Sequence, residues 1–254
     1  MKKILALVMT LALAFSFAGC NKKQAQGTSG DKVYKISSDN SFAPFEFLDS
    51  ETNKYIGLDM DIIAAVAKDQ NFKYEVKNEG FDAAMGSVQS GQADAMIAGM
   101  TINDERKKTF DFSEGYFEDG QILVVQSGSD IKTPADLKGK SVAAKTSTIS
   151  AEITEQYSKE YGFKVVYYED SPTMYTAVES GTNVACFEDR SVIGWAIKES
   201  GLKLKTTGDV LKPGYYGFAV RKGTNAELID MFNKGLENIK ASGEYDKILA
   251  KYGY

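Results

Sequence analysis

Hydrophobic and polar positions follow two periods along the chain, and these predict short strands that alternate with helices. Short runs of β-branched and apolar residues predict strands at 33–37, 122–126 and 141–144. Apolar residues at intervals of three and four predict helices with one buried face at 58–68, 150–161 and 227–242. This alternation of strands and helices indicates an α/β fold with mainly parallel sheets.

A short pattern occurs twice, 90 residues apart, at 88–95 and 178–185. In both copies a helix is predicted to end at a Ser-Gly pair, and a strand to begin a few residues later. In this register Gly99 of the first copy corresponds to Asp189 of the second. Helix–glycine–strand junctions also resemble one another in unrelated places, so a chance similarity is the alternative. We favour two lobes of similar topology, whose strand ends would line a shared cleft, which is where open α/β sheets bind ligands.

The first residues have the features of an export signal. Lys2 and Lys3 precede fifteen uncharged, mostly apolar residues, 4–18, which is the length of the apolar part of a signal peptide. A helix of that length rises about 22 Å, less than the ~30 Å hydrocarbon core, so a membrane span is not predicted. The sequence Phe17-Ala18-Gly19-Cys20 resembles a bacterial lipobox, except that Phe17 replaces the usual aliphatic residue.

The lipobox resemblance implies that residues 1–19 are a lipoprotein signal peptide and that Cys20 carries a lipid. An ordinary secretory signal with an unrelated cysteine is the alternative. Residues 20–30 are mainly polar, which is typical of a flexible tether. We therefore expect an exported protein that is anchored to the cell membrane by its lipid and faces the extracytoplasmic side.

Composition removes several classes of function. The 254 residues carry 30 basic and 35 acidic side chains, for a net charge of −5, and contain no histidine. This charge gives no basic footprint for nucleic acid, and the lack of histidine excludes Ser/His and Cys/His triads and His-ligated zinc. Cys20 and Cys186 are too few for a cysteine metal site or a disulfide framework. We expect neither a metal nor another cofactor.

The clearest chemical signal is Arg106, which follows Gly99 and the hydroxyl of Thr101. A guanidinium, a hydroxyl and backbone N–H groups close together are the donors that a carboxylate needs. Taken alone, an arginine at this place is more often solvated or part of a surface ion pair.

Two further clusters follow predicted strands. Asp39 comes where the first strand ends, and three phenylalanines follow it within eight residues; at least two of these are expected in the core. Lys145 ends another strand and precedes a hydroxyl-rich turn and a helix start, whose free N–H groups can bind an anion. Simple helix capping by Ser147 or Thr148 is the alternative.

With all three clusters in this order, the chain resembles the extracytoplasmic solute-binding proteins of polar amino-acid ABC importers (bacterial solute-binding protein family 3), most closely the glutamine-binding members. The resemblance covers the whole chain after the tether. The motifs that carry it are Asp39-x-x-Phe42-x-Pro44-Phe45-Glu46-Phe47, Gly57-Leu58-Asp59-Met60-Asp61, Gly99-x-Thr101-Ile102-x-Asp104-Glu105-Arg106, Asp111-Phe112-Ser113, Asp136-Leu137-Lys138-Gly139-Lys140, Tyr216-Gly217 and Gly243-x-Tyr245.

The resemblance implies a two-lobed fold of the periplasmic-binding-protein type II, in which each lobe is a mainly parallel sheet flanked by helices. Residues 31–117 and 218–254 would form lobe 1, and residues 118–217 would form lobe 2. Two hinge strands would cross between the lobes near 117–121 and 214–218. In this family a ligand closes the lobes, and the membrane subunits of the importer recognise the closed form.

The resemblance also assigns roles at the carboxylate end of the cleft. Arg106 would hold the α-carboxylate of the ligand, helped by Thr101 and by the N–H groups near Thr148 and Ile149. Ile149 stands where the family commonly has glycine or another small residue.

The resemblance assigns other residues to the α-ammonium group and to the aliphatic part of the ligand. Asp189, the Gly99 carbonyl and the Thr101 hydroxyl would receive the ammonium group. The rings of Phe42 and Phe81 would flank the aliphatic part.

Asp39 and Lys145 would meet the far end of the ligand side chain, and the charges there narrow its identity. Arg106 and Lys145 balance Asp39 and Asp189, so a neutral side chain fits, and an amide can donate to Asp39 and accept from Lys145. Glutamine is therefore expected. A basic amino acid (arginine, lysine or histidine) is the alternative, because a Glu188 that faces the ligand would make the site net negative. Alternation along a strand allows Glu188 to face away instead.

Two other classes of function stay open at this point. The fold also hosts periplasmic enzymes that resemble cyclohexadienyl dehydratase, in which Glu188 would be a general acid. The other class is a sensor domain, although no membrane helix or kinase segment is recognised before Tyr254. Binding without catalysis is the expectation, because all the residues with which the family binds an amino acid are present. The expected partners are a small-molecule amino acid and the importer's transmembrane subunits, with no nucleic acid, and the protein is expected to be a monomer.

Overall fold

The structure is a computed structural model that describes residues 32–254. The predicted signal peptide, the lipobox cysteine and the tether lie outside these residues. Within residues 32–254 no helix is both long enough and apolar enough to cross a membrane.

Strands and helices alternate along the described chain, as the sequence pattern predicts. The strands are β1 (Val33–Ser38), β2 (Ser41–Phe42), β3 (Glu46–Asp49), β4 (Lys54–Ile56), β5 (Lys73–Asn78), β6 (Ala95–Met96), β7 (Phe110–Phe112), β8 (Phe117–Gln126), β9 (Ser141–Lys145), β10 (Lys164–Tyr168), β11 (Ala185–Asp189), β12 (Leu204–Tyr216) and β13 (Ala219–Arg221). The helices are α1 (Leu58–Gln70), α2 (Phe81–Ser90), α3 (Ile149–Tyr161), α4 (Ser171–Glu179), α5 (Arg190–Ser200), α6 (Ala226–Ala241) and α7 (Glu244–Lys251). Short 3₁₀ turns lie at Arg106–Lys108 and Pro134–Leu137.

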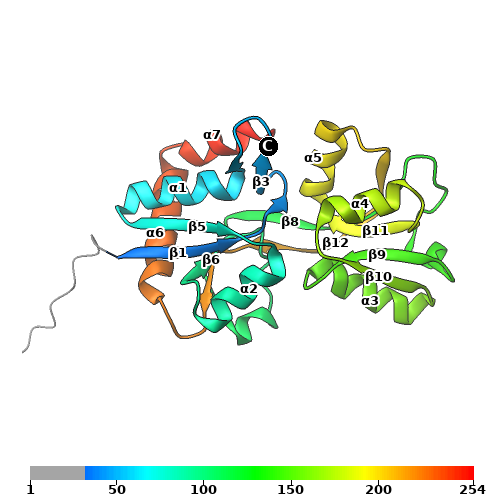
Figure 1. The fold of residues 1–254 in the computed structure, drawn as a ribbon, viewed down its shortest axis with the longest axis horizontal. Coiled ribbons are helices and arrows are strands. Elements are labelled where there is room, and N and C mark those ends of the chain that lie inside the picture. Colours follow the sequence, from blue (N-terminus) through cyan, green and yellow to red (C-terminus); the bar gives the residue numbers. More distant parts are fainter. Residues whose placement is uncertain (1–31) are drawn as a thin grey trace, which may run out of the picture.

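Two five-stranded sheets share one topology, and each forms the centre of a lobe (Figure 1). Their strand orders are β5-β1-β6-β13-β7 in lobe 1 and β10-β9-β11-β8-β12 in lobe 2. In each sheet the second strand pairs in parallel with the first and the third, while the fourth strand is antiparallel to both of its neighbours. The predicted α/β fold with mainly parallel sheets is confirmed, with one antiparallel strand in each sheet that the sequence pattern did not predict.

The repeated sequence pattern occupies equivalent places in the two sheets. In lobe 1, α2 ends at Gly91 and the chain enters β6; in lobe 2, α4 is followed by Gly181 and the chain enters β11. Both glycines have a positive φ, 78° and 80°, a backbone conformation that a side chain disfavours. Because β6 and β11 are each the third strand of their sheet, the two copies mark the same junction in two lobes of similar topology.

Helices cover both faces of each sheet, which is what sheets with buried parallel strands require. In lobe 1, α1 and α6 pack on each other and on α7, while α2 lies against β1. In lobe 2, neighbouring residues of β8 point to opposite faces, so Val124 joins the core under α4 and α5 and Val125 joins the core under α3. The free thiol of Cys186 is buried in the first of these cores.

Two long strands, β8 and β12, run from lobe 2 to lobe 1. They pair antiparallel along their length, from the Gln126–Leu204 pair to the Phe117–Tyr216 pair. At the lobe 1 end, Tyr216 also forms a β-bridge to Thr101. The sequence pattern predicted only the apolar half of β8, because residues 117–121 are largely polar and lack the period of a buried strand.

An aromatic contact joins the lobes on one side of this strand pair. The small sheet β2-β3-β4 of lobe 1 carries Phe47, whose ring lies 5.3 Å from the ring of Trp195 in α5 of lobe 2. Nearby, the Tyr254 hydroxyl donates a hydrogen bond of 3.0 Å to the Ser191 carbonyl of the same helix. These contacts lie outside the cavity between the lobes.

Candidate ligand-binding site

A small cavity between the lobes brings together nearly all of the predicted binding residues. Its volume is about 20 Å³, room for about one water molecule, so the lobes must separate to admit a larger ligand. The residues that line it are Phe42, Phe81, Ala98, Gly99, Thr101, Arg106, Lys145, Thr148, Ile149 and Asp189. Nine of these were predicted, and the tenth predicted residue, Asp39, is ion-paired to Lys145.

The topology explains why residues so far apart in sequence meet here. Asp39 follows β1 and Gly99 follows β6 in lobe 1, while Lys145 ends β9 and Asp189 ends β11 in lobe 2. Within each sheet these strands are parallel neighbours, so their carboxyl ends lie at the same edge. The two edges face each other, which is the place where open α/β sheets bind ligands.

Arg106 reaches across the cavity with few exposed atoms. Arg106 is only 9% exposed. Its guanidinium donates hydrogen bonds to the Thr101 carbonyl (2.9 Å) and to the Ser147 carbonyl of lobe 2 (3.1 Å). The guanidinium carbon also lies 5.3 Å from the centre of the Phe81 ring. Burial lowers the pKa of Arg106 to about 10, so the side chain stays a cation at neutral pH.

Lys145 and Asp39 form a buried ion pair between the lobes. Their Nζ and Oδ2 atoms lie 2.5 Å apart, and each side chain is 2% exposed. Lys145 Nζ also lies 4.9 Å from the centre of the Phe42 ring. Burial opposes the ammonium form, but the charge of Asp39 and its hydrogen bond, with a further contribution from Glu188, raise the pKa of Lys145 above its usual value. Lys145 is therefore a cation at neutral pH.

Asp189 is the acidic group at the other side of the cavity. Its carboxylate accepts hydrogen bonds from Gln121 Nε2 (2.8 Å) and from the Tyr216 hydroxyl (2.6 Å). Burial, together with the nearby charges of Glu188 and Asp119, raises the pKa of Asp189 well above its ordinary value. A cationic group beside it would stabilise the ionised carboxylate.

Glu188 does not line the cavity. Its carboxylate points into lobe 2, where it accepts hydrogen bonds from the hydroxyls of Ser171 (3.0 Å) and Tyr175 (2.7 Å) and from the backbone N–H of Asp189 (2.9 Å). Neighbouring residues in a strand face opposite sides, which is why Asp189 faces the cavity and Glu188 does not. Its charge still acts on Lys145 from behind.

The turn between β9 and α3 both caps a helix and lines the cavity. Thr148 is the N-cap of α3, and its hydroxyl accepts from Ala151 N–H (3.1 Å) and donates to the Lys145 carbonyl (2.8 Å). Ser147 has a positive φ of 63°, and its hydroxyl donates to Asp82 of lobe 1 (2.5 Å). Thr148 thus has a capping role while it also lines the cavity.

Some residues of the site gave no usable signal in the sequence. Ala98 lines the cavity through its position after β6, and Gln121 orients Asp189 from the polar half of β8. Tyr216 and Asp59 belong to motifs quoted above, yet their contacts with Asp189 and with the Gly99 N–H come from folding together segments that are distant in sequence.

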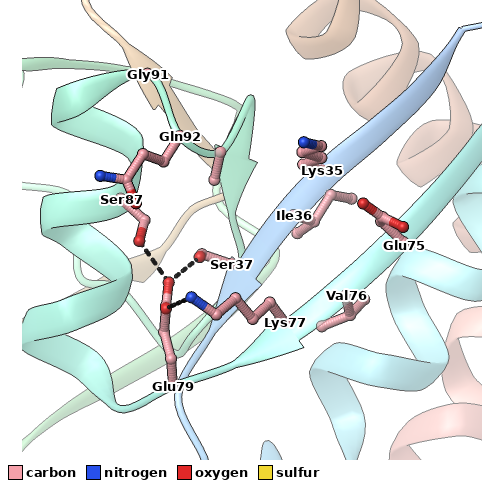
Figure 2. Close-up of a pocket in the computed structure, with 11 residues that line it drawn as sticks. Lys35, Ile36, Ser37, Glu75, Val76, Lys77, Glu79, Ser87, Gly91 and Gln92 are labelled. Carbon is pink, nitrogen blue, oxygen red and sulfur yellow. Dashed lines mark hydrogen bonds and ion pairs between the residues drawn. The ribbon is translucent and has the colours of Figure 1, made fainter.

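A larger groove lies on lobe 1 alone, between α2 and the strands β1 and β5 (Figure 2). Its volume is about 690 Å³. The carboxylate of Glu79 in this groove accepts from Ser37 and Ser87 (2.6 Å each) and pairs with Lys77. Because these polar groups satisfy one another and none is a predicted binding residue, the smaller cavity between the lobes is the candidate ligand site.

Among residues 32–254, no group of three or more Cys, Asp or Glu side chains is arranged to hold a metal ion.

Known proteins similar to this chain are amino-acid-binding proteins. The family model for bacterial extracellular solute-binding proteins, family 3, matches residues 34–254. A relative from Neisseria gonorrhoeae, named "probable histidine-binding protein", is 36% identical, and the match covers 99% of this chain and 96% of the relative.

Two solved structures add a comparison of lobe arrangement. An ancestral arginine-binding protein bound to glutamine is 37% identical, with a TM-score of 0.80, over 87% of this chain and 97% of that one. The second substrate-binding domain of Lactococcus lactis GlnP, in an open conformation, is 47% identical but has a TM-score of only 0.60, over 87% of this chain and 94% of that one. The higher score therefore goes with the ligand-bound structure, in agreement with the interlobe contacts of Arg106, Lys145 and Ser147. This chain belongs to the bacterial extracellular solute-binding proteins of family 3, the amino-acid-binding components of ABC importers.

Proposed function

We propose that the protein is lipid-anchored, captures L-glutamine by closure of its lobes and delivers it to an ABC importer. The observation that carries the choice of glutamine is the buried ion pair of Lys145 and Asp39 at one end of the cavity, opposite Arg106 and Asp189. The role is binding without turnover, in line with the relatives, which are binding proteins.

The α-carboxylate of the ligand would lie at Arg106, where a planar guanidinium can form two parallel hydrogen bonds. Thr101 and the first N–H groups of α3, near Thr148 and Ile149, would add donors, since a helix N-terminus favours an anion. All four residues line the cavity.

The rest of the amino acid would face the remaining walls. Asp189, Gly99 and Thr101 would receive the α-ammonium group, and the rings of Phe42 and Phe81 would enclose the aliphatic carbons. Each of these residues touches the same cavity, which supports one site for the whole ligand.

An amide side chain suits the ion pair because it is neutral and both accepts and donates. Its oxygen would accept from Lys145 and its NH₂ group would donate to Asp39. A glutamate carboxylate would be repelled by Asp39, and a lysine or arginine side chain by Lys145, each in a desolvated place where an unpaired charge is costly. The position of Glu188 outside the cavity supports the neutral choice.

A basic amino acid is the second candidate. Two observations favour it: the relative named for histidine, and the charge of Glu188, which acts on Lys145 from behind the cavity. If Lys145 turned toward Glu188, Asp39 would be free to pair with a cationic side chain.

Closure would be a rotation about the two connecting strands. We place the lobes at 31–117 with 218–254 and at 118–217, and the hinge near 117–121 and 214–218, where β8 and β12 pass between the sheets. The closed form, in which Lys145 meets Asp39, would be the one that the importer's membrane subunits accept.

Calorimetric titration tests the choice of ligand. We expect L-glutamine to bind at least about tenfold more tightly than L-glutamate, L-arginine and L-histidine, since one poorly compensated buried charge costs more than 1.4 kcal/mol. Tighter binding of arginine or histidine would replace glutamine by the second candidate. Turnover of prephenate or arogenate would contradict the binding role itself.

Replacing Phe47 by alanine should weaken ligand affinity about three- to tenfold, although Phe47 does not line the cavity. The reason is that an aromatic pair contributes about 0.5–1.5 kcal/mol, and the Phe47–Trp195 contact forms between the closed lobes. Trp195 is the only tryptophan, so its fluorescence during a ligand titration measures both closure and affinity. Leu48→Ala, in the same strand but 47% exposed, is the control and should bind as tightly as the unchanged protein.

Affinity should fall as the pH is lowered through the raised pKa of Asp189. Burial, Glu188 and Asp119 favour its protonated form in the free protein, whereas the ligand's ammonium group favours the ionised form. Binding therefore releases a proton, and affinity falls by up to about tenfold per pH unit below the free-state pKa. Titrations in buffers of different ionisation enthalpy would measure this proton. Asp189→Asn should bind more weakly and without that pH dependence; the same slope in this variant would assign the proton elsewhere.

Replacing Cys20 by serine should release the protein from membranes, because the lipid would have no thiol to attach to. Fractionation of cells that carry either form, with labelled palmitate, would show the change. A Cys20→Ser protein that still sediments with membranes would contradict lipid anchoring.

A further inference from the structure

Two acidic side chains meet in the interior of lobe 1, behind the cavity. Glu46 begins β3, Asp59 lies in the first turn of α1, and both residues are 0% exposed. A close approach of the two segments brings them together, since Asp59 N–H donates to the Phe45 carbonyl (2.9 Å). At Gly57 a Cβ atom would lie 2.0 Å from that same carbonyl oxygen, so only glycine permits this approach.

Several oxygens of the two carboxyl groups lack a hydrogen-bond donor unless one of the groups carries a proton. Oδ2 of Asp59 accepts from the Gly99 N–H and from the Tyr116 hydroxyl, each at 2.8 Å. The other carboxylate oxygen of Asp59 and both oxygens of Glu46 are buried and have no donor among the described residues. Two ionised carboxylates have no proton to offer each other, and burying them unpaired is costly.

The charged surroundings place the proton on Glu46. Burial and the charges of Asp59 and Asp39 raise its pKa well above the ordinary value, while Lys145 opposes this. Asp59 has the two donors, Gly99 and Tyr116, that stabilise an ionised carboxylate, and the two side chains lie within hydrogen-bond reach of each other.

We propose that Glu46 and Asp59 share one proton and act together as positioning residues for Gly99 in the wall of the binding site. Glu46 is a neutral carboxylic acid that donates to Asp59, and Asp59 holds the Gly99 N–H. The inference rests on the proposed function, in which the backbone of Gly99 receives the ligand's α-ammonium group.

Gly99 needs such an anchor because its backbone has an unusual conformation and lies close to a neighbouring ring. Its φ is 53°, and a Cβ atom there would lie 2.5 Å from the Phe42 ring. Glycine is the most flexible residue, so a hydrogen bond from a fixed carboxylate determines where its peptide group points. Loss of the shared proton would leave two charges that repel, and Asp59 would move off the Gly99 N–H.

Two substitutions at Glu46 separate the proton from the shape of the side chain. Glu46→Gln keeps a neutral donor to Asp59, whereas Glu46→Met keeps a similar volume and has no donor. We expect Glu46→Gln to bind L-glutamine, L-arginine and L-histidine within about threefold of the unchanged protein. We expect Glu46→Met to bind each of these about tenfold or more weakly, the effect of an unsatisfied buried acceptor.

Two spectroscopic measurements test the pair independently of ligand. The infrared difference spectrum between the unchanged protein and Glu46→Gln at pH 7 should contain the C=O stretch of a protonated carboxyl group, because the band of a protonated Asp189 is common to both proteins and cancels. The amide NMR resonance of Gly99 should stay in place in Glu46→Gln and shift in Glu46→Met.

The outcomes distinguish this inference from the proposed function. Lack of the infrared band, or a Glu46→Gln protein that binds as weakly as Glu46→Met, would overturn the shared proton. If no amino acid binds the unchanged protein, the proposed function fails, while the band and the Gly99 resonance still decide whether the pair exists. If Glu46→Met does not fold, the infrared and NMR results for Glu46→Gln decide alone.

Discussion

Replacing Arg106 by alanine should lower the affinity for the amino acid by about thirtyfold or more. The guanidinium is buried and joins the lobes through the Thr101 and Ser147 carbonyls. Its removal would leave the ligand's carboxylate without its main partner in a desolvated place, which costs about 2–5 kcal/mol, and each 1.4 kcal/mol is about tenfold in affinity. Calorimetric titration of the variant with the amino acid that binds the unchanged protein measures the loss.

Two further variants test whether the loss of affinity is due to the guanidinium group of Arg106. Arg106→Lys keeps the charge but loses the planar pair of donors, so it should recover only part of the affinity. Arg221→Ala removes an exposed arginine of the same lobe and should leave affinity unchanged. Binding by Arg106→Ala within threefold of the unchanged protein would remove Arg106 from the site.

Replacing Lys145 by methionine should reverse the choice of ligand. Asp39 would remain buried with no cation, which costs about 3–5 kcal/mol when one partner of a buried pair is removed. The variant should therefore have a lower melting temperature, bind glutamine at least about tenfold more weakly and gain affinity for arginine, whose guanidinium can pair with Asp39. Melting curves with and without each amino acid measure both effects.

The double variant Asp39→Asn with Lys145→Met removes both charges and should recover most of the lost stability, because no unpaired ion remains. Lys138→Met, an exposed lysine of the same lobe, is the matched control and should alter neither stability nor preference. If Lys145→Met keeps the ligand preference of the unchanged protein, the charge argument for glutamine is wrong.

The sequence could indicate which residues line the cavity where a strand end carries a distinctive side chain. Asp39, Lys145 and Asp189 each follow or end a strand, and parallel strands bring their carboxyl ends to one edge, so a list of strand ends is close to a list of cavity residues. The family resemblance, rather than any of the quoted motifs, added Phe81 and Ile149, whose local patterns alone would place them in a core. Both were found in the cavity wall.

Other features were beyond the reach of local patterns because they depend on segments that meet only in the folded chain. The polar residues 117–121 continue β8 because β12 pairs with them, and nothing in their own period shows this. The Phe47–Trp195 contact joins residues on different lobes. Glu188 and Asp189 are adjacent in sequence. Only the hydrogen bonds from Ser171 and Tyr175 to Glu188 show that Glu188 points into lobe 2, which leaves Asp189 to face the cavity.

The most direct test of the account is a thermal-shift panel of the twenty amino acids on the purified protein. A ligand at a hundred times its Kd adds about 2.7 kcal/mol to the free energy of unfolding, which is readily seen as a higher melting temperature. We expect the largest shift with L-glutamine, and a much smaller shift with it once Arg106 is replaced by alanine. A largest shift with arginine, lysine or histidine would contradict the reading of the Asp39–Lys145 pair, and a panel without any shift would contradict amino-acid binding at this cavity.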